Sequence, residues 1–444
     1  YAAAIAHRGQ PTVILAQTTK GYGMGASGQG ANSAHQTKKL ARVDLERFRE
    51  RFELPLSDQD LDELNYYHPG EDSREVRYLQ ERRAALGGYV PVRQREAKPI
   101  TLAQPDIYGP FHADSGEREL STTMSFVRLL GKLMADKQLG PRVVPVVADE
   151  ARTFGMQAMF RQFGIYSPWG QRYTPQDSDQ LAFYREDVKG QILEEGITEA
   201  GSMASWIAAG TAYSHSDEPM LPCYIFYSMF GFQRVGDLIW SAADCRARGF
   251  LLGATAGRTT LSGEGLQHED GQSLVYAATV PTCRAYDPAY GYEVAVIVED
   301  GVRRMMSEGE NAFYYITLYN ENYAHPAMPA GAEEGIRRGL YLLRTSTLAG
   351  KPRVQLLGSG SILREVLAAA ERLESEFAVA ADVWSATSFG ELRKDGLACD
   401  RWNLLHPTEA PRQPWVAQQL GGRGPIVAAT DFMRSYPDLI RNWV

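Results

Sequence analysis

From Ser121 onwards, short apolar runs alternate with longer segments in which apolar residues recur at helical spacing. This alternation constrains the fold more than any other feature, because parallel strands joined by a helix pack together only when the helix covers the sheet. The sequence therefore predicts an α/β fold with a parallel sheet covered by helices. The expected strands are 143–148, 223–227, 250–255 and 312–317, and the expected helices are 197–211, 232–248 and 292–305.

The residues after 325 repeat this alternation on a smaller scale. They predict strands at 354–357, 382–387 and 426–430 and a helix at 361–376. The sequence Gly-Ser-Gly-Ser at 358–361 lies between a strand and a helix, where glycine-rich turns can bind phosphate. Because the full dinucleotide-binding fingerprint is missing, a structural turn is the favoured interpretation. We expect a large α/β domain over 119–325 and a small C-terminal α/β domain over 326–444.

The first 118 residues have a different pattern. Residues 1–7 predict the end of a helix, and 12–19 predict a continuous apolar strand of the kind buried in parallel sheets. Five glycines in the ten positions from Gly21 predict a mobile loop. Residues 1–40 are therefore expected to be the last part of a domain that begins before Tyr1. Residues 41–118 predict an interdomain linker with charged helical stretches and a proline-marked connector.

Charge, apolar runs and cysteine usage restrict the classes of function. With a formal net charge of -8, the chain offers no basic stripe for a nucleic acid or an anionic membrane. The longest apolar run, 220–232, has too few residues to cross a bilayer. The 4 cysteines are far apart and fit neither a zinc pattern nor a disulfide framework, which favours a reducing, cytoplasmic location.

Polar residues gather in two places where predicted strands end. Asp149 and Glu150 follow the strand 143–148, and the polar loop 263–271 follows the strand 250–255. Sheets of this class bind ligands beyond the carboxyl ends of their strands. Both places are therefore candidate binding sites, and solvated loop residues are the alternative interpretation at each.

Three single residues stand out in the same way. A zinc motif that includes His268 would need a second histidine at 272, where Gln272 stands, so no metal ligand is assigned. Glu199 lies in the first turn of a helix of small residues, where a carboxylate caps the helix or is buried against a partner. His35 follows the glycine-rich loop, and a surface histidine is the alternative there.

Five collinear stretches carry a family resemblance, and together they span the chain: 20–25, 148–156, 195–199, 227–234 and 263–271. Their sequences are Lys-Gly-Tyr-Gly-Met-Gly, Ala-Asp-Glu-Ala-Arg-Thr-Phe-Gly-Met, Glu-Gly-Ile-Thr-Glu, Tyr-Ser-Met-Phe-Gly-Phe-Gln-Arg and Gly-Glu-Gly-Leu-Gln-His-Glu-Asp-Gly. In this order they resemble the homodimeric type of pyruvate dehydrogenase decarboxylating component, a thiamine-diphosphate-dependent enzyme of the transketolase-like superfamily. The resemblance implies oxidative decarboxylation of pyruvate and acetylation of the lipoyl group of a dihydrolipoyl acetyltransferase.

The resemblance also implies roles for residues of the domain 119–325, which would bind the aminopyrimidine of thiamine diphosphate. Glu199 matches the carboxylate that pairs with a ring nitrogen of that group and promotes its proton chemistry. Tyr227 and Phe230 match positions that line the pyrimidine pocket, and Asp149 and Glu150 match acids close to it.

Other matching residues concern the substrate and the mobile loop. His268 matches a histidine that reaches the substrate, and Glu264 lies in the same loop. His35 matches a histidine on a loop that orders over the active site and assists acetyl transfer, with Lys38 close behind it. Lys20 matches a position in the wall of the active site, at the hinge of that loop.

One departure from the family pattern concerns the metal. The family binds Mg²⁺ and the diphosphate through a Gly-Asp-Gly segment, and no Gly-Asp-Gly occurs in this chain. The Mg²⁺ ligands are therefore expected outside these residues, in a preceding domain or on a complementary chain. The expected partner is a second copy in a homodimer or a complementary chain with the diphosphate-binding domain. A non-catalytic or regulatory piece, and a relative that acts on another 2-oxo acid, are the two alternatives.

Overall fold

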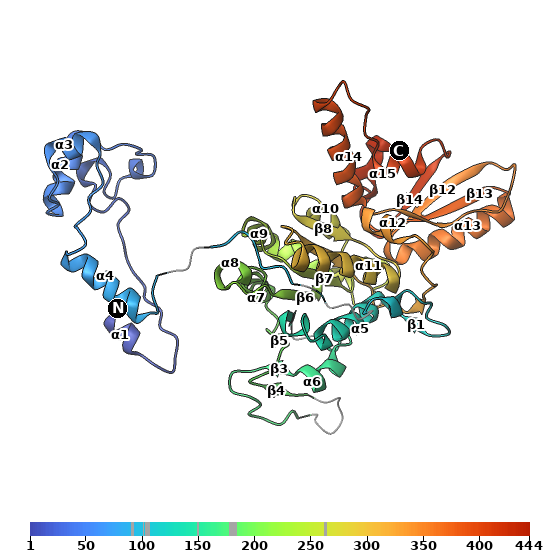
Figure 1. Cartoon of the computed structure of the whole chain (residues 1–444), viewed down its shortest axis with the longest axis horizontal. Coiled ribbons are helices and arrows are strands. Elements are labelled where there is room, and N and C mark those ends of the chain that lie inside the picture. Colours follow the sequence, from blue (N-terminus) through green and yellow to red (C-terminus); the bar gives the residue numbers. More distant parts are fainter. Residues whose placement is uncertain (90–92, 101, 103–106, 149–150, 177–183, 262–263) are drawn as a thin grey trace. The chain divides into compact units, whose positions relative to one another are not determined.

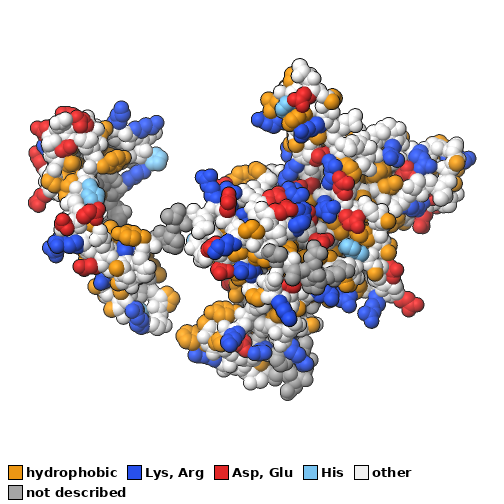
Figure 2. All heavy atoms as spheres, in the orientation of Figure 1, with side chains coloured by type: hydrophobic (Ala, Val, Ile, Leu, Met, Phe, Trp, Pro, Cys, Tyr) orange, Lys and Arg blue, Asp and Glu red, His pale blue; other side chains and the backbone are white. Residues whose placement is uncertain are grey.

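The computed structural model describes the chain except for residues 90–92, 101, 103–106, 149–150, 177–183 and 262–263 (Figure 1). The chain divides into two compact units, Tyr1–Val90 and Pro91–Val444. Figure 2 shows basic and acidic side chains intermingled over the visible face of each unit. No helix among the described residues is long and apolar enough to cross a membrane.

The unit Tyr1–Val90 is helical. Its helices are α1 (Ala2–Ala6), α2 (Arg42–Arg51), α3 (Asp58–Glu63) and α4 (Arg74–Ala85). A capping box starts α3, because Ser57 Oγ accepts from the Asp60 backbone N–H at 3.1 Å and Asp60 Oδ2 accepts from the Ser57 N–H at 2.8 Å. Two of the four unpaired amides at this helix end are thereby satisfied.

The prediction of a buried strand at 12–19 is wrong. These residues form no strand, and Val13 and Leu15 are 80% and 93% exposed. A parallel strand is stabilised by its neighbours in a sheet, and no strand occurs among the described residues of this unit. An apolar run alone therefore did not suffice to make a strand here.

The unit Pro91–Val444 contains a six-stranded sheet in which every strand pairs in parallel with its neighbours. The strand order is β5-β2-β6-β7-β9-β8. The strands are β2 (Val143–Val147), β5 (Leu193–Glu194), β6 (Leu221–Tyr227), β7 (Phe250–Ala254), β8 (Cys283–Tyr286) and β9 (Phe313–Thr317). This confirms the four predicted strands and the α/β class, while β5 and β8 were not predicted.

Helices cover both faces of this sheet, as the buried positions of β6 show. Cys223 and Ile225 join a core cluster with α5 (Thr122–Ala135) and α11 (Gly291–Val302). The alternate residues Tyr224 and Phe226 join a second cluster with α7 and α9. Successive strand residues point to opposite faces, so both faces of β6 need an apolar cover. The further helices are α7 (Glu199–Gly210), α8 (Ala212–Ser216), α9 (Phe232–Asp244) and α10 (Ser273–Ala277).

A four-stranded sheet forms the C-terminal part of this unit. Its order is β11-β13-β12-β14, with β11 antiparallel to β13 and the other pairs parallel. The strands are β11 (Tyr341–Arg344), β12 (Arg353–Gly358), β13 (Ala380–Ser385) and β14 (Ile426–Ala429). The helices are α12 (Glu333–Arg338), α13 (Leu363–Phe377), α14 (Phe389–Leu405) and α15 (Trp415–Leu420). The predicted small α/β domain is therefore present.

The turn at 358–361 is structural, as predicted. Ser359 and Ser361 are buried. Ser359 Oγ donates to Asp287 Oδ2 at 2.7 Å and contacts Thr430 Oγ1 at 3.0 Å. Asp287 follows β8, so this turn joins the two sheets by a buried hydrogen bond and presents no open surface for a phosphate.

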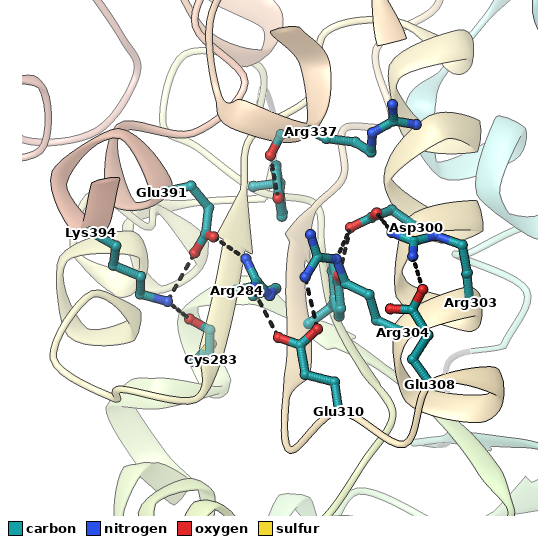
Figure 3. A network of polar contacts seen from close by, with 12 residues as sticks. Cys283, Arg284, Asp300, Arg303, Arg304, Glu308, Glu310, Arg337, Glu391 and Lys394 are labelled. Atoms are coloured by element: carbon teal, nitrogen blue, oxygen red, sulfur yellow. Dashed lines mark hydrogen bonds and ion pairs between the residues drawn. The ribbon is translucent and has the colours of Figure 1, made fainter. Parts of the chain in front are cut away.

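A network of ion pairs at the other end of β8 also joins the two sheets (Figure 3). Arg284 in β8 bonds Glu391 of α14 at 2.5 Å and Glu310 at 2.8 Å. Lys394 bonds Glu391 at 2.9 Å, and Arg304 bonds Glu310 at 2.8 Å. Because each of the two carboxylates contacts two cations, its charge is compensated and α14 is held against β8.

Short elements complete the unit. Strands β1 (Glu119–Leu120) and β10 (Tyr323–Ala324) form an antiparallel ribbon. Strands β3 (Ile165–Tyr166) and β4 (Glu186–Asp187) pair in parallel beyond α6 (Gln157–Phe163).

Candidate active site

Four of the predicted site residues lie where segments leave the carboxyl ends of the parallel strands. Tyr227 ends β6, and Phe230 follows it in the connection to α9. Glu199 begins α7, which follows β5, and His268 lies in the segment that follows β7. The carboxyl ends of parallel strands share one edge of the sheet, which is where such sheets bind ligands.

Aromatic rings surround His268. Its imidazole stacks on the Tyr227 ring, with centroids 4.9 Å apart and planes 6° apart. Phe230 meets the same imidazole edge to face at 5.2 Å. The ring of Phe154 packs against the ring of Tyr227, with centroids 5.4 Å apart. The rings fix the imidazole plane and provide an apolar wall beside it.

Glu264 fixes the proton on His268. Glu264 Oε2 lies 3.1 Å from His268 Nδ1, and both side chains are partly buried. An ionised carboxylate only accepts hydrogen bonds, so Nδ1 is the donor. In the neutral ring Nε2 is then the acceptor, which makes it the nitrogen able to take up or return a proton.

Asp270 anchors the segment that carries His268. Its buried carboxylate accepts from Ser228 Oγ at 2.6 Å and from Gln233 Nε2 at 2.8 Å. It also accepts from the hydroxyl of Ser273 and from the backbone N–H of that residue. A buried carboxylate is stable when several donors replace its water, and these donors bind the loop to the start of α9.

The C-terminal sheet holds the other end of the same segment. Asp431, just after β14, accepts from the backbone N–H groups of Arg258 and Thr259 at 2.6 and 3.0 Å. Arg258 Nε donates in return to the Asp431 carbonyl at 2.7 Å. The loop with Glu264 and His268 is thus fixed at both ends.

Glu199 reaches this aromatic cluster through Arg234, a residue that the sequence analysis did not single out. Arg234 Nη1 donates to Glu199 Oε1 at 2.9 Å, and the guanidinium lies 4.0 Å from the centroid of the Phe230 ring. Thr198 caps α7 by accepting from the Gly201 N–H at 3.3 Å, so Glu199 need not cap the helix itself. In the sequence, Arg234 was marked only by its place four residues after Phe230, at the end of the matching stretch 227–234.

The remaining predicted residues have three different outcomes. Asp149 and Glu150 lie outside the described residues. In the unit Tyr1–Val90, the Nζ of Lys20 lies 2.8 Å from His35 Nδ1. Because an ammonium group only donates, Nδ1 is the acceptor in this contact. Lys38, which lies three residues after His35, is exposed to solvent.

No cluster of metal-binding type is present in the described part of the chain: nowhere in it do three or more His, Cys, Asp or Glu side chains converge so as to hold an ion. The site at the sheet edge therefore offers one carboxylate paired with a guanidinium, a wall of aromatic rings and an imidazole oriented by a second carboxylate. This set suits a planar ring with a basic nitrogen, together with a small substrate that exchanges a proton.

Two family models match the chain. The model described as "Pyruvate dehydrogenase E1 component middle domain" matches residues 106–326. The model described as "Transketolase-like TK C-terminal domain" matches residues 339–442. Both matches lie within the unit Pro91–Val444 and include all the residues of the candidate site at the sheet edge.

Curated proteins named pyruvate dehydrogenase E1 component are similar over essentially the whole chain. The protein of Pseudomonas aeruginosa is 59% identical over 445 residues, covering 100% of this chain and 50% of its own length. That of Escherichia coli K12 is 54% identical over 98% of this chain and 49% of its own length. That of Mycobacterium tuberculosis is 52% identical over 100% of this chain and 48% of its own length. The chain thus spans about half the length of the curated relatives it matches.

Solved structures of transketolases share the fold. The enzyme of Campylobacter jejuni superposes with a TM-score of 0.60 at 16% identity, covering 95% of this chain and 56% of that one. The enzyme of Leishmania mexicana gives 0.59 at 16% identity, covering 97% and 57%. At this identity the likeness concerns the fold, and it confirms the predicted transketolase-like architecture.

Proposed function

Because this chain belongs to the pyruvate dehydrogenase E1 component family, we propose that it carries part of the active site of a thiamine-diphosphate-dependent pyruvate dehydrogenase. The reaction would be the oxidative decarboxylation of pyruvate with acetylation of the lipoyl group of a dihydrolipoyl acetyltransferase, on the way to acetyl-CoA. The observation that supports this proposal is the convergence of four residues at one sheet edge: Tyr227, Phe230 and His268 contact one another directly, and Arg234 joins Glu199 to Phe230.

The residues at this edge fit the aminopyrimidine end of thiamine diphosphate. Tyr227 and Phe230 offer ring faces and edges for a planar heterocycle. Glu199 offers a partly buried carboxylate that can bond a ring nitrogen. When bound, the cofactor would supply the carbon nucleophile for the carbonyl of pyruvate and accept the electrons that remain after CO₂ leaves.

Glu199 would act on the proton of the bound ring nitrogen. Its carboxylate is held by Arg234, which in turn packs over Phe230. A ring nitrogen that bonds Glu199 competes with the guanidinium for the same oxygen atoms. Arg234 would therefore keep Glu199 oriented before the cofactor binds, and would move away from Oε1 as the new hydrogen bond forms.

His268 would act on the substrate side. With Nδ1–H held by Glu264, the neutral ring presents Nε2 for a proton of the reacting pyruvate oxygen. The parallel contact with Tyr227 prevents the ring from rotating away. When Nε2 takes a proton, Glu264 continues to accept the hydrogen bond from Nδ1–H.

The proposed domain roles follow the resemblance. Residues 1–40 would be the end of a diphosphate-binding domain with the mobile loop of Lys20, His35 and Lys38, and 41–118 would link it to the rest. Residues 119–325 would bind the pyrimidine, with Asp149 and Glu150 near it, and 326–444 would form the transketolase-like C-terminal domain. The ligands of Mg²⁺ and of the diphosphate would lie outside these residues, and the partner would be a second copy in a homodimer or a complementary chain. The assembly would belong to a cytoplasmic multienzyme complex.

The substitution Glu199→Ala tests the proposal. In the holoenzyme reconstituted with thiamine diphosphate and Mg²⁺, we expect pyruvate decarboxylation with an artificial electron acceptor to fall by at least about 100-fold. The matched control is Glu365→Ala, which removes another first-turn carboxylate, from α13. Normal turnover of the Glu199→Ala enzyme, or equal losses in both variants, would remove Glu199 from the mechanism.

A further inference from the structure

A second pocket lies away from the residues assigned above. It has a volume of about 290 Å³ and is lined by residues of the β1–β10 ribbon, α5, the start of α11 and the segment before β1. Three basic residues line it, namely Arg118, Arg128 and Lys132, together with one acid, Asp114. The side chains thus bring a net charge of about two positive units to one small space.

Among the described residues, the three cations have no acidic partner. The side chains of Arg118, Arg128 and Lys132 make no ion pair and no hydrogen bond in this part of the chain, whereas Arg284, Arg304, Arg338 and Arg364 of the same unit each bond an acid. Arg128 and Lys132 lie four residues apart on α5, where like charges repel. The chain as a whole carries a net charge of -8, yet the positive charge of these three side chains is not neutralised locally. A bound anion would neutralise it.

His325 forms a buried part of the lining of the same pocket. It is 6% exposed, and its Nδ1 accepts from the Gly291 backbone N–H at 3.0 Å. Burial lowers the pKa of His325 to about 4, and the backbone of Leu120 offsets only part of that effect. Because Nδ1 accepts this hydrogen bond, the neutral ring carries its proton on Nε2, which is buried.

The position of His325 also connects the pocket with a helix dipole. Gly291 begins α11, a helix of 12 residues, and its N–H belongs to the positive end of that helix. The imidazole accepts this N–H on one nitrogen and presents its own N–H on the other. Gly291 and His325 both line the pocket, so the positive end of α11 lies at its wall and favours a negative charge there.

Ser115 supplies a hydroxyl on the same wall. Its Oγ accepts from the His325 backbone N–H at 2.9 Å. Its own hydroxyl hydrogen has no acceptor in the part of the chain described. Pro110 and Phe111 add apolar groups to the lining. The lining thus combines charged and neutral donors with a surface for a short organic group.

We propose that this pocket is a binding site for a small phosphate-bearing anion. A phosphate monoester carries close to two negative charges and three acceptor oxygens, which match the net charge and the several donors of the pocket. A carboxylate has one charge and would leave donors unsatisfied. Free inorganic phosphate and the phosphate group of a small organic molecule share this chemistry.

Calorimetric titration of the whole protein tests the site. Inorganic phosphate and glycerol 3-phosphate serve as probes, with acetate as the carboxylate, at pH about 8 where phosphate is a dianion and with ionic strength held constant by NaCl. The test variant is Arg128→Gln/Lys132→Gln. The matched control is Lys351→Gln/Arg401→Gln, which removes two equally exposed and unpaired cations elsewhere in the unit.

We expect saturable phosphate binding by the wild-type and control proteins, and binding weaker by at least about tenfold in the test variant. Tighter binding of glycerol 3-phosphate than of inorganic phosphate would identify an organic phosphate as the ligand, and the reverse order would identify free phosphate. The proposal is overturned if wild-type binding does not saturate, if acetate binds as tightly as phosphate, or if the test variant binds like the control. Unfolding curves without phosphate verify that both variants are folded.

Discussion

The imidazole of His268 lies parallel to the ring of Tyr227, with centroids 4.9 Å apart and planes within 6°. The contact joins the end of one strand to a loop that follows the next strand, so two connections of the sheet fix one imidazole. Glu264 then determines which of its nitrogens carries the proton. The consequence is an imidazole whose plane and tautomer are both set before a substrate arrives, which reduces the reorganisation needed for proton transfer.

His268→Ala removes the group that would exchange a proton with the substrate. We expect turnover of pyruvate in the holoenzyme to fall by about 100-fold or more, because general acid–base catalysis contributes at least this much. Glu264→Gln keeps the ring but lets either tautomer form, so its loss should be smaller. Steady-state kinetics with saturating cofactor measure both. His215→Ala removes an exposed histidine of α8 and should leave turnover unchanged; unaltered kinetics in His268→Ala would contradict the role.

Arg234→Gln removes the cation between Glu199 and Phe230 while leaving the helix intact. The guanidinium is half-exposed, so we expect the free energy of unfolding to change by less than about 1 kcal/mol. The turnover should nevertheless fall by about tenfold, because a misoriented Glu199 bonds the cofactor poorly. Cofactor titrations of turnover measure the effect. Arg372→Gln breaks an exposed pair with Glu376 and serves as the control; similar turnover in both variants would show that Arg234 does not orient Glu199.

His35→Ala separates two half-reactions. By the proposed role on the mobile loop, decarboxylation followed with an artificial electron acceptor should stay near the wild-type rate. Acetylation of a lipoyl domain should fall by about tenfold or more, since only that step needs the loop histidine. The exposed neighbour Lys39 provides the control Lys39→Ala. Equal losses in the two assays would assign His35 to the structure of the loop instead of acetyl transfer.

Asp287 predicts a pH dependence of stability. Burial raises its pKa to about 6, although Thr317, Tyr319 and Ser359 donate hydrogen bonds that lower it. An unfolded chain releases this proton near pH 4, so between about pH 4 and 6 the folded protein binds more protons than the unfolded one. Raising the pH through this window therefore lowers the free energy of unfolding, by at most about 3 kcal/mol.

Comparison with Asp287→Asn isolates this effect, since the amide does not titrate. Urea unfolding at several pH values measures the free energy of unfolding of the wild type and of the variant. The wild-type value minus the variant value should decrease as the pH rises from about 4 to 6. Asp244→Asn, at an exposed position on α9, is the control and should show no such slope. A pH-independent difference for Asp287→Asn would mean that the folded and unfolded states share one pKa.

Local patterns predicted much of the larger unit. The apolar runs at 143–148 and 250–255 became β2 and β7, because both faces of a central strand are buried and leave a continuous apolar signal. The helical periodicity after Ser121 likewise became α5, with Ser121 Oγ accepting from the Met124 N–H at 3.0 Å. These features depend on residues close together in sequence, which a pattern can capture.

Local pattern singled out Glu199 and the loop of His268 as candidates, and the family resemblance added Tyr227 and Phe230 and implied a role for each of the four. The structure brings these four together, and their chemical roles stay predictions. Tertiary contacts alone revealed Arg234, which lies 35 positions from its partner Glu199. The same holds for the contact between Asp431 and Arg258, which are 173 positions apart.

The sequence by itself determined the class of fold and the position of seven of the ten strands in the two larger sheets, because strand and helix formation follow the spacing of apolar residues within a few turns of chain. Only the tertiary structure decided that the apolar run 12–19 forms no strand, since a strand also needs a neighbour to share its backbone hydrogen bonds. It likewise decided which charges meet, as at Glu199 and in the pocket of His325. Strand order and loop path bring such groups together, and neither is written in local spacing.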